Sequence, residues 1–162
     1  MIEFARTHII GRAAGHSAVK AAAYRSGTKQ HDQRNGLTAD YGFRVDEVAH
    51  SEILLPEGAP EALLDRSTLW NEIEFAEDKS TRRSTAQLAK DHIIAWPREL
   101  NLYQQIELAR EFAQTLTAQG VGVDLNVHLH SQDNPHAHLM TCLLYTSPSP
   151  RDRTRSRMPS SA

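Results

Sequence analysis

Histidine is concentrated in one short part of this chain. The stretch HLHSQDNPHAH at residues 128–138 holds four of the nine histidines of the protein. Apolar and polar residues alternate through residues 123–130, and this period of two predicts a half-buried β-strand with its histidines on the polar face. Residues 131–135 are turn formers, after which His136 and His138 again lie on one face of a strand.

Pairing of these two strands as a hairpin would place His128 beside His136 and His138. Three neutral imidazoles on one face suit a divalent transition metal and leave coordination positions open for a substrate. His130 shares the polar face with His128 by strand alternation alone, so it is a ligand, a hydrogen-bond partner of a ligand, or a bystander. The pattern predicts a metal site built on His128, His136 and His138.

The composition limits the classes of protein that such a site could belong to. With 162 residues, 40% hydrophobic and 23% charged, the chain has the size and balance of one soluble globular domain. It has no apolar run of roughly 18 residues and no secretory signal pattern, so we expect a cytoplasmic protein without membrane insertion. The single cysteine, Cys142, excludes an internal disulfide and a thiolate cage. The net charge of −2 gives no support for a basic, nucleic-acid-binding surface.

Tyr24 is a further residue with reactive chemistry, and a short helix must position it. Ser17 is a good N-cap and Gly27 a good residue just beyond a helix end, so residues 18–26 are predicted to be helical. A strand at residues 2–10 would precede this helix. Taken alone, Tyr24 has an ordinary alternative role as an aromatic plug that fills the space left by the alanines around it.

The chain between this helix and the histidine stretch supplies the remaining elements. They are, in order, a hairpin turn at Asn35-Gly36, strands at residues 37–45 and 50–56, a helix at 60–77, a strand at 89–97, and a helix that starts at Asn101 and ends at Gly120. Asp91 lies inside a predicted buried strand and needs a partner there. This order of elements predicts an α+β fold in which helices flank an antiparallel sheet.

The composition changes abruptly after Thr141. Residues 142–162 combine serine, proline and arginine without periodicity, which is typical of disorder. Back-translation of the segment CLLYTS also resembles the transposase-end adapter used in sequencing libraries. We therefore expect a domain at residues 1–141 that is incomplete at its C-terminus, followed by an artefactual tail whose arginines are not a DNA-binding arm.

Two motifs together resemble a known family. The first motif is Tyr24 near the end of the small-residue helix AVKAAAYRSG, and the second is the H-x7-H-x-H pattern that contains NPHAH. In combination they resemble the motifs of the MobA/MobL-type relaxases, which belong to the HUH endonuclease superfamily. The segments HSEILLP, AKDHIIAWPREL and EFAQ extend the resemblance over most of residues 2–141. Members of this family nick plasmid DNA at an origin of transfer to begin conjugative mobilisation. The resemblance implies a relaxase-like sheet related to the ferredoxin and RRM folds.

The resemblance also implies roles for individual residues. Tyr24 would be the nucleophile that forms a 5′-phosphotyrosine link. Asp91 falls where the family tends to have an acid near the site, and it would fix the tautomer of a ligand histidine. His130 has no counterpart in the family pattern. The metal ligands would be His128, His136 and His138. Contacts to phosphate are predicted for the basic residues Lys20, Arg25, Lys79, Arg82 and Arg83.

Cofactor and partners follow from the same resemblance. A tyrosine hydroxyl has a pKa of about 10 and is a poor nucleophile at neutral pH, so a divalent ion would polarise the scissile phosphate. We expect magnesium or manganese in use, with zinc, nickel and cobalt as alternatives. The implied partners are single-stranded DNA at an origin of transfer, relaxosome accessory proteins and a type IV secretion coupling protein.

Two other functions stay open at this point. A rolling-circle replication initiator or a transposase of the HUH superfamily would use the same tyrosine and metal chemistry. A non-catalytic metal-binding or DNA-binding module would instead keep Tyr24 packed in the core.

Overall fold

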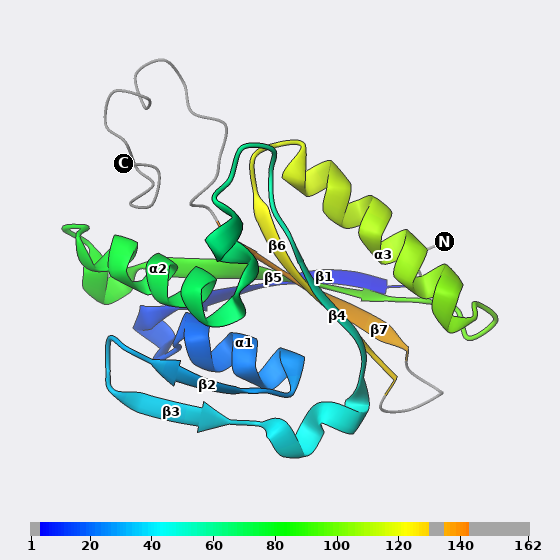
Figure 1. Ribbon diagram of the computed structural model, residues 1–162, viewed down its shortest axis with the longest axis horizontal. Coiled ribbons are helices and arrows are strands. Elements are labelled where there is room, and N and C mark those ends of the chain that lie inside the picture. The colour runs from blue at the N-terminus through cyan, green and yellow to red at the C-terminus, as the bar shows by residue number, and fades with distance from the viewer. Residues whose placement is uncertain (1–3, 130–134, 143–162) are drawn as a thin grey trace.

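Five strands form one antiparallel sheet at the centre of the protein. The structure, a computed structural model, describes residues 4–129 and 135–142. In sheet order the strands are β1 (Phe4–Gly11), β5 (Gln87–Ala95), β7 (His136–Cys142), β6 (Gly122–His128) and β4 (Val48–Leu54), and every neighbouring pair is antiparallel. α1 (Ala18–Ser26) and α2 (Arg66–Asp78) lie on one side of the sheet and α3 (Leu102–Thr117) on the other (Figure 1). The predicted α+β fold with helices flanking an antiparallel sheet is confirmed.

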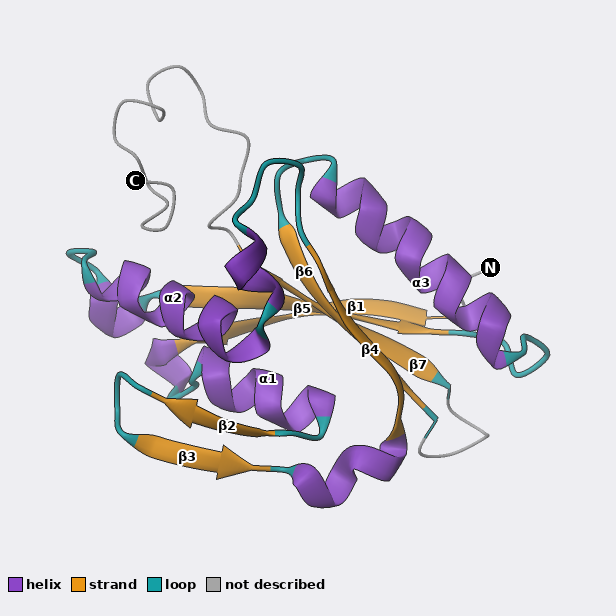
Figure 2. Cartoon of the chain, in the orientation of Figure 1, coloured by secondary structure: helices purple, strands orange, loops and turns teal. Residues whose placement is uncertain are grey.

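A small hairpin lies outside the main sheet, beside α1 (Figure 2). β2 (Lys29–Asp32) and β3 (Leu37–Asp40) pair antiparallel around the predicted turn, in which Gly36 has a φ of 74°. Asp32, at the end of β2, is buried and accepts a hydrogen bond from the Ser17 hydroxyl at 2.6 Å. The hairpin is therefore tied to the N-terminal end of α1.

The ends of the helices follow the capping residues of the sequence. Ser17 accepts a hydrogen bond from the Lys20 backbone N–H at the start of α1, and Gly27 ends that helix with a φ of 65°. Asn101 and Gln104 form the predicted capping box at the start of α3. α1 is also held from outside, because Glu74 of α2 accepts the N–H of Ala18 at 2.7 Å.

Two predicted elements are shorter than expected. The strand predicted at residues 37–45 ends at Asp40, because the Tyr41 N–H donates to the Thr28 carbonyl and the chain turns into a short 3-10 helix, η2 (Gly42–Glu47). The helix predicted at residues 60–77 begins at Arg66 instead, since Asp65 caps it through the Thr68 N–H. The remaining short helices are η1 (Arg12–Ala14), η3 (Glu61–Leu64) and η4 (Arg83–Thr85).

β6 is buried on both faces, so the prediction of a half-buried strand was wrong. Val123, Leu125 and Val127 pack with the helix α3 on one side. The alternate residues face α1 and α2, where Asp124 accepts hydrogen bonds from Arg66 at 2.7 and 2.8 Å and from Trp70 at 2.8 Å. A strand between two helical layers must bury its polar residues too, and it pairs them because an unpaired buried charge is costly.

The described residues end with β7 on the C-terminal side. Cys142, predicted as the first residue of the tail, is the buried last residue of that strand. Residues 143–162, which make up the rest of the predicted tail, lie outside the described residues, as does His130. No helix in the described ranges is long and apolar enough to cross a membrane.

Candidate metal centre and nucleophile

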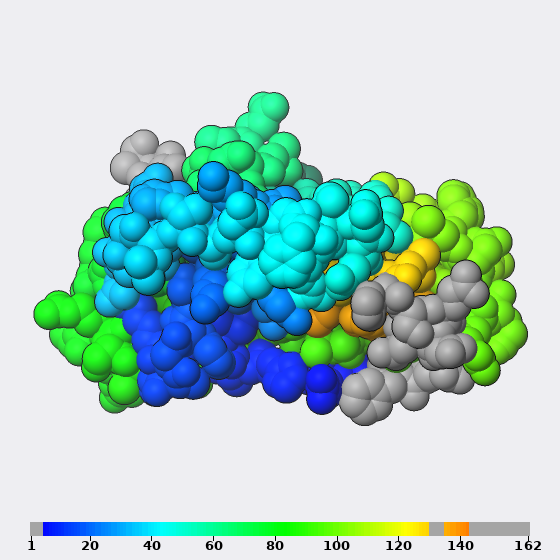
Figure 3. Space-filling model, turned by 90° about the horizontal axis from the view of Figure 1, so that it is seen from below, coloured from blue at the N-terminus to red at the C-terminus, as the bar shows by residue number. Residues whose placement is uncertain are grey.

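The three predicted ligand histidines converge at one end of the β6–β7 hairpin. His128 is directly opposite His136 in the sheet register, and His138 is opposite Asn126 on the same strand pair. One ring nitrogen from each of the three histidines lies within 4.8 Å of those of the others, and the ring centroids are 4.8 to 5.1 Å apart. Atoms of β6 and β7, in yellow and orange, are visible at the surface there beside the cyan segment that contains η2 (Figure 3).

Hydrogen bonds to two of these rings define which nitrogen is free. The His128 Nε2 lies 2.6 Å from the Arg25 carbonyl oxygen, which can only accept, so Nε2 carries the hydrogen and Nδ1 has the lone pair. The His138 Nδ1 lies 2.9 Å from the Asp91 Oδ2, so this ring keeps a lone pair on Nε2. Each of these two rings therefore has one nitrogen that is hydrogen-bonded to the protein and one that is available to a cation.

Asp91 anchors one of these rings from the neighbouring strand β5. Its side chain is fully buried, and its Oδ2 accepts hydrogen bonds from His138 and from the Arg25 Nε, the latter at 2.8 Å. Burial by itself would raise the pKa of Asp91, but the hydrogen bond from His138 and the charge of Arg25 hold that pKa at about 2. Asp91 is therefore a carboxylate at neutral pH and acts as an acceptor.

Burial keeps His128, the first of the predicted ligands, neutral. Desolvation lowers the pKa of His128 to about 4. The hydrogen bond to the Arg25 carbonyl raises this pKa, but by less than desolvation lowers it. Only a neutral imidazole can coordinate a metal. His128 therefore has its metal-binding form over the whole physiological pH range.

The donor set fits a divalent ion. A tetrahedral ion with bonds of about 2.1 Å holds its nitrogen ligands about 3.4 Å apart, which small side-chain rotations would reach from the present separations. The Asp91 Oδ1 is buried without a hydrogen-bond partner among the described residues. Such an acceptor is compatible with a cation or a bound water nearby.

Tyr24 lies on α1, the helix whose Arg25 contacts both His128 and Asp91. Its side chain is 44% exposed, so Tyr24 is not the buried aromatic plug considered from the sequence. The ring of Tyr41 meets that of Tyr24 edge-on at 5.1 Å, and the Arg44 guanidinium carbon lies 3.7 Å from its centroid. Because the helix that carries Tyr24 also contacts His128 and Asp91 through Arg25, the tyrosine and the histidines lie on the same side of the sheet.

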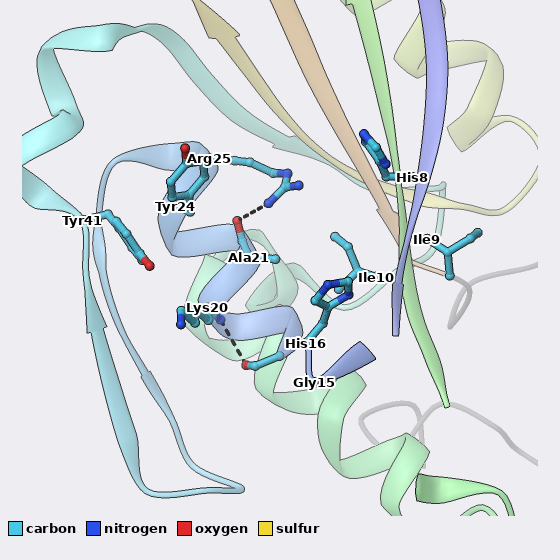
Figure 4. A pocket seen from close by; sticks show the side chains of 11 residues that line it. His8, Ile9, Ile10, Gly15, His16, Lys20, Ala21, Tyr24, Arg25 and Tyr41 are labelled. Carbon is cyan, nitrogen blue, oxygen red and sulfur yellow. Dashed lines mark hydrogen bonds between the residues drawn. The ribbon is translucent and has the colours of Figure 1, made fainter. Parts of the chain in front are cut away.

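A pocket of about 400 Å³ opens beside Tyr24, between β1 and α1 (Figure 4). Its polar lining includes Lys20, His8 and His16, and the phenol of Tyr41 lies near that of Tyr24. The His16 Nδ1 accepts the Gly11 backbone N–H, which leaves its Nε2 as a hydrogen-bond donor. Sequence reasoning missed these histidines because they stand alone on separate elements.

The predicted phosphate-binding residues fall into two groups. Lys20 and Arg25 are on α1 and line the pocket. Lys79, Arg82 and Arg83 lie between α2 and the start of β5, whereas the opposite end of that strand, Ala95, pairs with His136. A strand of 9 residues places these ends about 26 Å apart. The structure does not bring the second group to the histidines.

Comparisons with known proteins place the chain in a family. The MobA/MobL family model matches residues 16–157, most of the chain. The chain belongs to the MobA/MobL family. The match runs past the domain boundary predicted at residue 141.

Several proteins resemble this MobA/MobL chain. It is 38% identical over 124 residues to the conjugal transfer protein TraA of Rhizobium radiobacter, which covers 70% of the chain and 11% of that protein. It is 40% identical over 107 residues to the mobilization protein MobL of Acidithiobacillus ferridurans, covering 66% of the chain and 26% of that protein. The chain thus spans about a tenth to a quarter of the length of these relatives.

A solved structure resembles this MobA/MobL chain over most of its length. It is described as "Molecular Basis of Vancomycin Resistance Transfer in Staphylococcus aureus", with 32% identity and a TM-score of 0.81. The similarity covers 94% of this chain and 74% of the other. The resemblance inferred from the tyrosine helix and the histidine motif is therefore confirmed for the family and the fold.

Proposed function

We propose that this MobA/MobL chain nicks single-stranded DNA at a plasmid origin of transfer, with Tyr24 as nucleophile and a divalent ion on His128, His136 and His138. One observation carries the proposal. Arg25, the residue next to Tyr24, binds His128 through its carbonyl oxygen and Asp91 through its side chain. The helix that bears the phenol is thereby joined directly to the imidazoles.

The reaction exchanges one phosphodiester for another. The Tyr24 phenol oxygen forms a bond to phosphorus while the bond from phosphorus to the 3′ oxygen breaks. The phenol proton passes to solvent, and the 3′ oxygen takes up a proton and leaves as a hydroxyl. The product is a 5′-phosphotyrosine that retains the energy of the broken bond, so a later rejoining step needs no ATP.

The charged residues of the site prepare this exchange. When bound, an ion on the histidines would polarise the phosphate and neutralise the charge that develops on it. Magnesium and manganese, which prefer oxygen-rich surroundings, fit a site that shares its ion with a phosphate, and the three nitrogens also suit zinc, nickel or cobalt. Asp91 remains ionised and holds the His138 ring in the tautomer that presents Nε2.

The pocket beside Tyr24 would receive the strand. Lys20 supplies a positive charge at its wall, and His8 and His16 supply ring nitrogens. The space of about 400 Å³ lies in the range of ordinary ligand sites and can take a nucleotide. Relaxosome accessory proteins and a type IV secretion coupling protein would be the partners of the whole protein.

A covalent adduct is the test. The chain is incubated with Mn²⁺ and a pool of single-stranded oligonucleotides with a randomised central segment, and DNA that stays attached after denaturation is recovered and sequenced. We expect an adduct with the wild-type chain and none with Tyr24→Phe, although this variant should keep its affinity for Mn²⁺ and DNA. An adduct that persists in Tyr24→Phe would exclude this nucleophile. Metal and DNA binding without any adduct would favour a non-catalytic module.

A further inference from the structure

Arg44 holds the face of the Tyr24 ring. The guanidinium carbon is 3.7 Å from the ring centroid, a separation typical of a close cation–π contact. The ring also meets the ring of Tyr41 in a T-shaped arrangement, with the two centroids 5.1 Å apart. A ring that is contacted by both an arginine and a second aromatic ring has few directions left for its hydroxyl.

Arg44 is itself fixed by an ion pair. Its Nε and Nη2 donate to one oxygen of Glu47 at 3.1 and 2.9 Å, an i,i+3 pair within the same short helix. Only 15% of the Arg44 side chain is exposed, and its Nη1 is buried without a hydrogen-bond partner among the described residues. A buried, unpaired donor is a cost. Arg44 thus keeps its place on the Tyr24 ring although one of its donors has no hydrogen-bond partner there.

The segment that carries Arg44 also reaches the histidines. Residues 41–48, which we term the clasp, run from the β2–β3 hairpin to β4 past the end of α1. The Glu47 carbonyl accepts the Leu129 N–H at 3.1 Å, and Val48 pairs with His128 in the sheet. One short segment therefore contacts the proposed nucleophile at one point and the histidine hairpin at another.

A glycine makes this close approach feasible. Gly27 ends α1, and a Cβ at that position would lie 3.0 Å from both the N and the Cα of Val45. The backbone of the clasp thus rests directly on the end of the tyrosine helix. Arg44 and Tyr24 are brought together by this backbone contact as well as by their side chains.

We propose that Arg44 is a positioning residue for DNA nicking, which fixes the direction of the Tyr24 phenol and, through the clasp, couples it to the histidine hairpin. This inference rests on the proposed nicking function. The expected effect of losing Arg44 on the nicking rate follows from geometry, because a displacement of about 1 Å in a reacting group can cost on the order of 100-fold in rate. Arginine suits the task better than lysine, since its planar group stacks on an aromatic face.

The test compares three variants in single-turnover adduct formation at saturating Mn²⁺ and oligonucleotide. For Arg44→Gln we expect the rate constant to fall on the order of 10- to 100-fold, while the dissociation constants for Mn²⁺ and DNA stay within about twofold of wild type. Arg44→Lys should recover only part of the loss. The matched control is Arg110→Gln, because Arg110 pairs with Glu52 and Glu107 on the opposite face of the sheet.

Two further measurements separate positioning from a general structural role. Free guanidinium ion at millimolar concentration should restore part of the rate lost in Arg44→Ala and should leave Arg110→Gln unchanged. Fluorotyrosine placed at position 24 should show a changed fluorine NMR signal in Arg44→Gln but not in Arg110→Gln, and this readout needs no DNA.

The outcomes are distinguishable. A wild-type rate constant in Arg44→Gln, or an unchanged fluorine signal, overturns the inference while the nicking proposal stands. A loss that appears only when the assay is repeated below saturating DNA also overturns it, because Arg44 would then be a DNA contact. A wild-type chain that forms no adduct overturns the proposed function itself.

Discussion

Asp91 is the residue at which two parts of the site meet. One oxygen of this buried carboxylate accepts hydrogen bonds from both Arg25 of the tyrosine helix and His138 of the histidine hairpin. A single charged atom therefore holds both Arg25 and the ring of His138, a proposed metal ligand. Its removal should affect metal affinity and stability at the same time.

The substitution Asp91→Asn tests this double role. We expect the affinity for Mn²⁺ or Zn²⁺ to fall about 10- to 100-fold, because the acceptor that orients His138, a proposed metal ligand, loses its charge. The free energy of unfolding should fall by about 3 kcal/mol, since Arg25 is left without its buried partner. Isothermal titration calorimetry measures the metal affinity. Urea unfolding of the metal-free protein measures the stability.

Asp78→Asn is the matched control for that experiment. Asp78 pairs with Arg12 at 2.9 Å and with Arg34 at 2.7 Å, on the part of α2 away from the histidines. Its loss should cost some stability and leave the metal affinity unchanged. An Asp91→Asn variant with wild-type metal affinity would contradict the orienting role.

The His128 imidazole should make the stability of the metal-free protein depend on pH. Its pKa is about 4 in the folded chain, below the ordinary value of about 6.5, so between these values the unfolded chain binds a proton that the folded chain does not. Stability should therefore be lost as pH falls from about 6.5 to about 4, by up to about 3 kcal/mol. Urea unfolding with a chelator present measures this slope.

Two other groups must be separated from this titration. Burial also lowers the pKa of His92, which adds a slope of the same sign, so His128→Gln should remove part of the slope and not all of it. Asp91, with a pKa of about 2, loses its contribution only below its ordinary value of about 4, outside the window. An unchanged slope in His128→Gln would count against the neutral, buried state of this ring.

Among the elements, the end of α1 has a strict packing requirement. Gly27 combines a left-handed φ of 65° with a close approach to the clasp backbone, whereas Gly58 has a φ of 86° and nothing within 4 Å of an added Cβ. An alanine at either position takes on the cost of the left-handed conformation, about 1–2 kcal/mol. Only at Gly27 must the neighbouring backbone also move.

The pair Gly27→Ala and Gly58→Ala separates these two effects. We expect Gly58→Ala to lower the free energy of unfolding by about 1–2 kcal/mol and to keep wild-type adduct formation. Gly27→Ala should lose more stability and also slow adduct formation, because the clasp shifts away from Tyr24. Denaturant unfolding measures the free energy of unfolding, and the single-turnover assay measures the rate constant of adduct formation. Equal losses in both variants would show that the close approach is unimportant.

At the scale of the whole molecule, the basic residues differ in their distance from the histidines. Lys20 lines the pocket beside Tyr24, whereas Lys79, Arg82 and Arg83 precede the start of β5, the opposite end of that strand from Ala95, which pairs with His136. The length of about 26 Å between the two ends of that strand exceeds the screening length of about 10 Å at 0.1 M salt, so these three residues are too far away to act on a phosphate at the histidines. The net charge of −2 adds no general attraction for DNA.

The salt dependence of DNA binding should show this division. With a single-stranded oligonucleotide of about six nucleotides, Lys20→Gln should reduce the slope of log affinity against log salt concentration by about 0.7. Joint replacement of Lys79, Arg82 and Arg83 by glutamine should leave the slope unchanged. Fluorescence anisotropy over a salt series measures both. A reduced slope in the triple variant would place DNA across the far end of the sheet.

Local patterns in the sequence determined most of the elements and the candidate ligands. Ser17 and Gly27 delimit α1, the capping box starts α3, and the alternation around the histidines forms β6 and β7, because caps and strand periodicity act between residues a few positions apart. The same spacing brought His128, His136 and His138 together across one hairpin. These features needed no knowledge of the remaining fold.

The tertiary structure alone decided what surrounds those ligands. β5 pairs between β1 and β7, which places Asp91 against His138 although 47 positions separate them in the chain. The clasp lays Arg44 on Tyr24 in the same way. No short-range pattern encodes such contacts, because strand order and register are set by the burial of both sheet faces at once. The sequence therefore determined which groups could react, and the packing of the sheet decided which charges hold them in place.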